Sequence, residues 1–220
     1  MEIISLIQDS LPSLLSGLLV TVEIAVISLI LAVILGIILG IFSISKVKIL
    51  KSIATVYIYI IRGTPLMIQA LFLFFGVGQA LSIKFDPMVA AIITLTINAS
   101  AYMAEIFRAG IQAVDNGQME AARCLGLSYT KAMKKVILPQ AIKIMIPSII
   151  NQFIVTIKDT SILSVISIRE LTLSGQIIIA RNFKPLQMYA IMAAMYFILI
   201  TLLTIASGYI ERRLSYGNKR

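Results

Sequence analysis

Polar side chains inside one apolar stretch are the first candidates for chemistry. Asn98, Tyr102 and Glu105 stand at i, i+4 and i+7 within residues 88–107. In a helix this spacing places an amide, a phenol and a carboxylate on one face. Asn98 could accept a hydrogen bond from an α-ammonium group and donate one to an α-carboxylate, or it could join two helices instead. Glu105 could face the same ligand, or form an ion pair with Arg108 three residues later.

A second polar group, Lys158-Asp159-Thr160, follows another apolar stretch. Adjacent helical residues do not share a face, so this group predicts a helix end. There Lys158 could meet a carboxylate and Asp159 an ammonium group. Alternatively, the two charges neutralise each other and Asp159 or Thr160 caps the next helix. Gln69, inside an earlier apolar stretch, is a further candidate for contact with a polar substrate.

Several other kinds of chemistry are excluded by the residue types present. The chain has no histidine, which excludes histidine metal sites and histidine acid–base catalysis. Its single cysteine, Cys124, excludes an internal disulfide and a cysteine-based metal framework. No glycine-rich phosphate loop ending in Lys-Ser or Lys-Thr occurs in the sequence. We therefore expect no catalytic residue, no metal site and no cofactor in this chain.

The elements that must position these residues are membrane helices. Of the 220 residues, 59% are hydrophobic and 13% are charged, whereas soluble domains are nearer half apolar and a quarter charged. Several apolar runs reach spanning length, so we predict an all-α membrane protein with about five transmembrane helices in one domain, residues 1–220. The net charge of +9 fits cytoplasmic loops and requires no nucleic acid.

The predicted boundaries follow from the apolar runs and their interruptions. Thr64 is expected to cap the second span and Pro65 to lie in its first turn. Gly36 and Gly40 form a small-xxx-small pair, which indicates either a close helix contact or ordinary membrane glycine. The chain divides into an interfacial helix at 1–15, spans at 16–42, 65–81, 88–107, 136–157 and 187–210, an interfacial elbow at 52–61, and a partly re-entrant outside segment at 158–185.

Loop charges give the orientation. Lys46, Lys48 and Lys51 follow the first span with almost no acidic residues, and four basic residues follow Glu211. Because excess lysine and arginine collects on the cytoplasmic side, these segments are predicted to be cytoplasmic. The N-terminus then lies outside and the C-terminus in the cytoplasm.

The longest polar interruption, residues 117–141, reads GQMEAARCLGLSYTKAMKKVILPQA. Small residues follow Met119, and Gly126 is typical of a helix end. The pattern predicts a short cytoplasmic helix, 117–128, between the third and fourth spans. Its small residues allow another protein to approach the backbone closely. An amphipathic helix at the lipid surface is the alternative.

This segment resembles a known motif. Glu120-Ala121-Ala122, then Gly126, then Ile137-Leu138-Pro139, is similar to the EAA loop of permease subunits in bacterial ABC importers. Five blocks, in the same order along the chain, resemble the polar amino acid branch of these permeases, the histidine/arginine/glutamine permease type. The blocks are RGTPLMIQ (62–69), AYMAEIFRAGI (101–111), GQMEAARCLGLS (117–128), ILPQA (137–141) and KDTSIL (158–163).

The resemblance implies a role and a set of partners. The helix at 117–128 would be a coupling helix seated in a groove of an ATPase subunit through Glu120, Ala121, Ala122, Leu125 and Gly126. The complex would contain two permease subunits, as a homodimer or a homologous heterodimer, and two ATP-binding cassette subunits that bind ATP and Mg. An extracellular solute-binding protein would deliver the amino acid. The location implied is the bacterial cytoplasmic membrane, with lipid around the multi-pass chain.

Two other functions compete with this interpretation. An ion-coupled secondary transporter or channel subunit would work without an ATPase, and a purely structural membrane subunit would move no substrate. The ordered EAA block argues against both. The expected substrate is a polar L-amino acid bound near Asn98, Tyr102, Lys158, Asp159, Thr160, Gln69 and Glu105. Asp159 and Glu105 are compatible with a basic substrate, but the blocks do not identify which amino acid it is.

Overall fold

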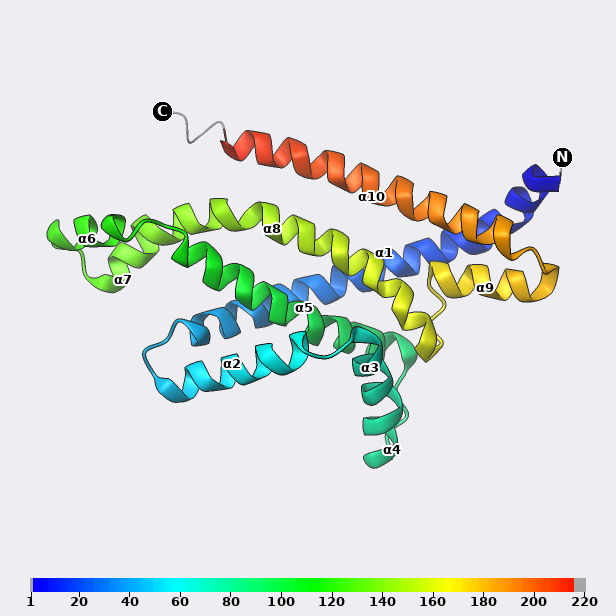
Figure 1. Cartoon of the computed structure of the whole chain (residues 1–220), viewed down its shortest axis with the longest axis horizontal. Helices are drawn as coiled ribbons and strands as arrows, with labels where there is room; N and C mark the ends of the chain where they lie inside the picture. The colour runs from blue at the N-terminus through cyan, green and yellow to red at the C-terminus, as the bar shows by residue number, and fades with distance from the viewer. Residues whose placement is uncertain (1, 216–220) are drawn as a thin grey trace.

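The computed structural model describes residues 2–215, which are helical apart from short connections (Figure 1). The predicted all-α class is confirmed. Four helical stretches have the length and composition to cross a membrane, and a bent helix pair makes a fifth, in agreement with about five spans. The elements are α1 (Glu2–Ser43), α2 (Lys48–Arg62), α3 (Leu66–Leu71), the π-helix η1 (Phe72–Val77), α4 (Gly78–Ala80), α5 (Pro87–Gln112), α6 (Asn116–Cys124), α7 (Tyr129–Ala132), the π-helix η2 (Met133–Ile137), α8 (Leu138–Asp159), the 3-10 helix η3 (Thr160–Ile166), α9 (Leu171–Asn182) and α10 (Pro185–Ser215).

Helix α1 packs along α5, and small residues make this contact close. A Cβ added at Gly36 would meet the Cβ of Met103, and one at Gly40 would lie 3.0 Å from the Cβ of Phe107. Because glycine has no side chain, the two helix backbones approach each other closely here, as they do at small-xxx-small pairs in membranes. Of the two interpretations of this glycine pair, the structure supports the close helix contact.

The start of α1 differs from the predicted division. Residues 1–15 were expected to form a separate interfacial helix, but α1 continues without a break from Glu2 to Ser43. Pro12 lies inside this helix, near its N-terminal end. The apolar stretch that can span the membrane already begins at Leu6. The polar residues near the N-terminus therefore mark one end of a long helix, and they do not mark a separate element.

Helices α2 and α3 form a sharp elbow, with a bend of 103° between Lys48–Arg62 and Leu66–Ala80. The predictions for Thr64 and Pro65 were wrong in detail. The Thr64 hydroxyl donates to the Ile60 carbonyl, 3.0 Å away, at the end of α2, and no side chain caps α3. Pro65 precedes the first residue of α3, with extended backbone. Thr64 therefore closes the helix before the bend and does not open the one after it.

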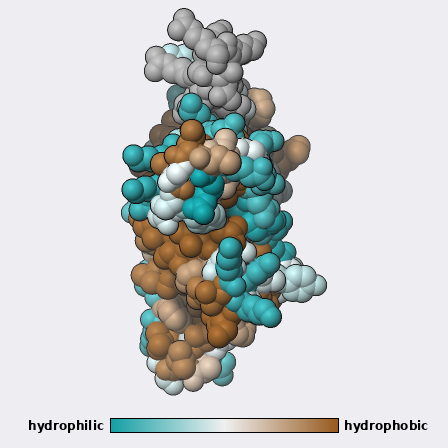
Figure 2. All heavy atoms as spheres, turned by 90° about the vertical axis from the view of Figure 1, so that its left-hand side faces the viewer, coloured by the Kyte–Doolittle hydropathy of each residue, from teal (hydrophilic) through white to brown (hydrophobic). Residues whose placement is uncertain are grey.

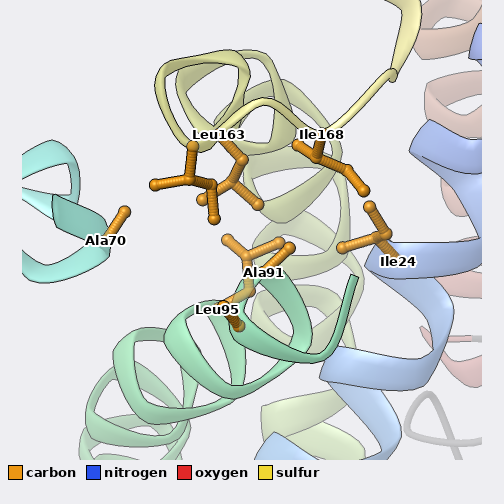
Figure 3. Close-up of a cluster of buried hydrophobic side chains, with 8 residues drawn as sticks. Ile24, Ala70, Ala91, Leu95, Leu163 and Ile168 are labelled. Carbon is orange, nitrogen blue, oxygen red and sulfur yellow. The ribbon is translucent and has the colours of Figure 1, made fainter. Parts of the chain in front are cut away.

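A buried apolar cluster fixes the elbow against the rest of the bundle (Figure 3). Ala70 of α3 faces Leu163 of η3, while Ala91 and Leu95 of α5 lie between them and Ile24 of α1. Each of these five side chains is at most 1% exposed. Their packing holds α3, α5 and the end of α8 together, and this brings polar residues from three distant segments to one place.

The segment after α8 ends in a buried acidic cap. Glu170 precedes α9 and accepts hydrogen bonds from the backbone N–H groups of Thr172, at 2.9 Å, and Leu173, at 2.8 Å. The Tyr196 hydroxyl of α10 donates to the same carboxylate, at 2.9 Å. Burial raises the pKa of Glu170, and the donated hydrogen bonds partly oppose this change. This carboxylate therefore joins α9 to α10.

Candidate functional site

A cavity of about 580 Å³ lies between the elbow, α5 and α8. Asn98 and Tyr102 of α5 reach it from one side, and Asp159, the last residue of α8, reaches it from another. Three of the predicted substrate residues are thus brought together by helices that are far apart in sequence. The remaining lining residues are Arg62, Gly63, Thr64, Pro65, Leu66, Gln152 and Val155.

Gln69 does not line this cavity, but it holds the elbow to α5. Its side-chain Nε2 donates to the Ile61 carbonyl and to the Thr64 hydroxyl, both at 2.8 Å. Its Oε1 accepts from the Asn98 amide, at 3.0 Å. The expected interhelical hydrogen bond of Asn98 is therefore present, and the same residue, which is 6% exposed, also lines the cavity. Gln69 satisfies backbone carbonyls that the bend leaves free.

Arg62, the last residue of α2, lies where three cavities meet. It lines the 580 Å³ cavity and two others, of about 620 and 760 Å³, which extend along α5 toward Arg108 and Ala113 respectively. Its guanidinium carbon is 5.2 Å from the centroid of the Tyr102 ring, within cation–π range. Arg62 and Tyr102 together therefore separate the cavity at Asn98 from those nearer the α6 end.

Glu105 forms the ion pair expected from its spacing to Arg108. The Arg108 Nε and Nη2 atoms donate to the two carboxylate oxygens, at 3.0 and 2.8 Å. Arg62 Nη1 lies 3.6 Å from the same carboxylate. Glu105 lines the two outer cavities and is absent from the lining of the cavity at Asn98. Its carboxylate thus links two arginines one helical turn away from the candidate site.

Two further predicted residues, like Gln69 and Glu105, do not line the cavity at Asn98. Lys158 is exposed and does not line the cavity. Thr160 is fully buried, and its hydroxyl donates to the Ile157 carbonyl, at 2.7 Å. As expected, a helix ends at Lys158-Asp159, but neither Asp159 nor Thr160 caps a following helix through its side chain. Because adjacent helical residues do not share a face, the three side chains point in different directions.

Two lining residues were missed. Arg62 was not among the predicted site residues, because its approach to Tyr102 depends on the 103° bend. Gln152 lies in α8 at 8% exposure and lines the cavity. A polar amide inside an apolar span is itself a signal for function, and this signal could have identified Gln152.

The candidate coupling segment is a separate exposed helix, α6, at the end of the molecule. It begins at Asn116, one residue earlier than predicted, because the Asp115 side chain accepts from the Gly117 N–H at 2.7 Å. It ends at Cys124, before the predicted limit of residue 128. Gly126 has a φ of +82°, and the Leu127 N–H donates to the Ala122 carbonyl, at 3.2 Å. This geometry is a Schellman cap, so the predicted glycine stop is present.

Helix α6 presents its side chains unevenly. Ala122 is 4% exposed and holds the helix to the body, while Glu120 and Ala121 face outward. Leu125 is 84% exposed. Glu120, Ala121 and Leu125 are therefore the predicted coupling residues that lie at the surface of α6.

Most of the chain matches known proteins. Residues 32–216 match the family model described as "Binding-protein-dependent transport system inner membrane component". The glutamine transport system permease protein GlnP of Escherichia coli strain K12 is 41% identical over 163 residues, which are 74% of this chain and 74% of that protein. The arginine transport system permease protein ArtQ of Bacillus subtilis strain 168 is 38% identical over 204 residues, 93% of each chain.

Solved structures agree with these relatives. A crystal structure of an amino acid ABC transporter with histidines superimposes with a TM-score of 0.93 at 38% identity, covering 97% of this chain and 99% of that one. The inward-facing MetNI methionine ABC transporter gives a TM-score of 0.77 at 18% identity, covering 92% and 96%. The second likeness supports the fold alone.

Proposed function

Because this chain belongs to the family of binding-protein-dependent transport system inner membrane components, we propose that it is the permease subunit of an ATP-driven importer of a polar L-amino acid. One observation carries the proposal. A cation, Arg62, and a carboxylate, Asp159, line the same 580 Å³ cavity, together with the amides of Asn98 and Gln152. An amino acid carries an α-carboxylate and an α-ammonium group, which are complementary to this pair.

The cavity suits a small zwitterion. Its volume lies within the ordinary range for small-molecule sites, about 300–1,000 Å³. Arg62 would bind the α-carboxylate and Asp159 the α-ammonium group, since charge-assisted hydrogen bonds are the strongest that side chains make. The amides of Asn98 and Gln152 would then face the substrate side chain. Relatives named for glutamine, arginine and L-cystine support a polar amino acid, and the carboxylate at Asp159 is also compatible with a basic one.

Energy would come from separate chains. This sequence has no phosphate loop, so two ATP-binding cassette subunits would bind ATP and Mg, and this chain would hold no cofactor and catalyse no reaction. Helix α6 would sit in a groove of the ATPase, with Glu120, Ala121 and Leu125 facing it. ATP binding would draw the α6 helices of two permease subunits together and open the bundle outward. A solute-binding protein outside the bacterial cytoplasmic membrane would then release the amino acid into the path.

Uptake by the assembled complex tests the substrate site. We expect Asp159→Asn to abolish most ATP-driven uptake of radiolabelled glutamine, arginine or cystine into vesicles, while the complex still co-purifies with its ATPase. Lys158→Gln is the matched control, because Lys158 is the adjacent residue but lies outside the cavity lining. Full uptake by Asp159→Asn, or equal loss in both variants, would contradict the site. Uptake that continues without ATP and follows an ion gradient would favour the secondary transporter.

A further inference from the structure

A second cavity, of about 770 Å³, opens at the end of the bundle that carries α6 and α7. It lies between the last turns of α1, the end of α5 and the start of α8. No residue lines both this cavity and the one at Asn98. Its walls are mainly apolar, formed by Ile37 and Ile41 of α1, Phe107 and Ile111 of α5, and Ile142 and Met145 of α8.

The mouth of this cavity is positively charged. Lys46, directly after α1, and Lys134, in η2, both line it and are exposed. No acidic residue lines it, and neither lysine forms an ion pair with the side chains described, those of residues 6–209. Figure 2 looks onto this end of the molecule and shows brown apolar atoms exposed between teal hydrophilic groups. The surface thus combines a deep apolar wall with two cations at one edge.

This combination selects the chemistry of the occupant. An amino acid would leave most of the apolar wall uncovered, and a neutral lipid would leave the lysines without a counter-charge. A phospholipid with an anionic headgroup satisfies both parts, because basic pockets between membrane helices bind such headgroups. The lysines stand at the ends of apolar helices, where their ammonium groups reach the headgroup level.

We propose that this cavity binds an anionic phospholipid, with an acyl chain between α1, α5 and α8 and its phosphate between Lys46 and Lys134. The bound lipid would join the end of α1 to η2, two segments that lie 88 positions apart in the sequence (134 − 46). The proposal rests on the membrane class of the chain and does not require the substrate site to be correct.

Native mass spectrometry of the full chain in detergent tests this site with two lipids of identical acyl chains, phosphatidylglycerol and phosphatidylcholine. The test variant is K46Q/K134Q. The matched control is K48Q/K135Q, which removes two charges from the same two segments at positions that do not line the cavity. We expect K46Q/K134Q to bind phosphatidylglycerol about thirtyfold more weakly than the unmodified chain, and the control to bind it normally.

A second variant tests the apolar wall without changing charge. Ile142, which is 51% exposed and lines the cavity, is replaced by tryptophan, and Ile198→Trp on exposed α10 is the control. Loss of the lipid in Ile142→Trp alone supports an acyl chain in the cavity. Equal retention of both lipids by the unmodified chain, or equal loss in both lysine double variants, would overturn the proposal. So would cross-linking of Ile142→Cys to a partner protein in native membranes.

Discussion

Substitutions at Gly126 test the predicted coupling helix, because at this position the effect of backbone conformation can be separated from the effect of contact with a partner protein. It holds a φ of +82° directly after α6, and a Cβ built there meets no atom within 4 Å. Substitution therefore introduces no clash within the chain. Its cost comes from forcing an L-residue into the left-handed region, where the Cβ crowds the backbone.

For Gly126→Ala we expect a cost of about 1–2 kcal/mol, which lowers the equilibrium constant for forming the turn about 5- to 30-fold. Asparagine tolerates the left-handed conformation better than alanine, and β-branched valine tolerates it least. If the ATPase binds only the ordered α6, its affinity and ATP-driven uptake should fall in the order Gly, Asn, Ala, Val. Gly208→Ala is the control, since a Cβ there also meets nothing within 4 Å and its φ is not positive.

Affinity of the purified ATPase for the permease in nanodiscs, followed by uptake in vesicles, gives the two readouts. Binding of the transported amino acid to the permease should stay unchanged in the series, because α6 lies outside the lining of the candidate cavity. Results ordered by side-chain size, with Ala above Asn and Val lowest, would refute the backbone argument. They would show that the partner surface, and not the left-handed turn, requires glycine here.

Three further predictions concern the body of the molecule. Glu105→Gln removes the carboxylate shared by Arg62 and Arg108; because all three side chains are partly exposed, we expect a loss of only about 1 kcal/mol, measured as a thermal shift in detergent. Burial raises the pKa of Glu170 above its value in the unfolded chain. The stabilising contribution of Glu170 is therefore complete below about pH 4 and falls as pH rises through the folded pKa. Thermal unfolding measured from pH 4 to 8 should show this loss of stability, and Glu170→Gln should make stability depend less on pH. Gly36→Leu should separate α1 from α5 and cost about 1–3 kcal/mol or more, whereas leucine at open Gly208 should cost little in the same unfolding assay.

Helix periodicity predicted one face of α5 correctly. The spacing of Asn98, Tyr102 and Glu105 placed them on one face of α5, and the structure agrees. Periodicity does not report depth along the helix, however. Asn98 joins Asp159 in one cavity, while Glu105 is engaged by arginines in another. The separation of Asn98 from Glu105 depends on where α2 ends, and the spacing of residues within α5 does not predict that position.

The missed features depended on contacts between distant segments or on an unused local signal. Arg62 reaches Tyr102 because apolar packing around Ala70 fixes the elbow. No pattern within residues 52–69 contains that contact. By contrast, Asp115 two residues before Gly117 is an ordinary N-cap signal, and its use would have placed the start of α6 correctly.

The unbroken length of α1 sets how motion can spread through this subunit. Its 42 residues form a rod about 63 Å long, roughly twice the thickness of the lipid hydrocarbon. At the middle of α1, the Leu171 N–H of α9 donates to the Thr21 hydroxyl at 3.2 Å, and toward the C-terminal end of the helix, Gly36 lies against α5. With no internal joint beyond Pro12, the rod transmits rotation and does not absorb it. A tilt of about 5° at one end displaces the other by about 5 Å, so α1 is the lever through which bilayer thickness would bias the two ends of the bundle together.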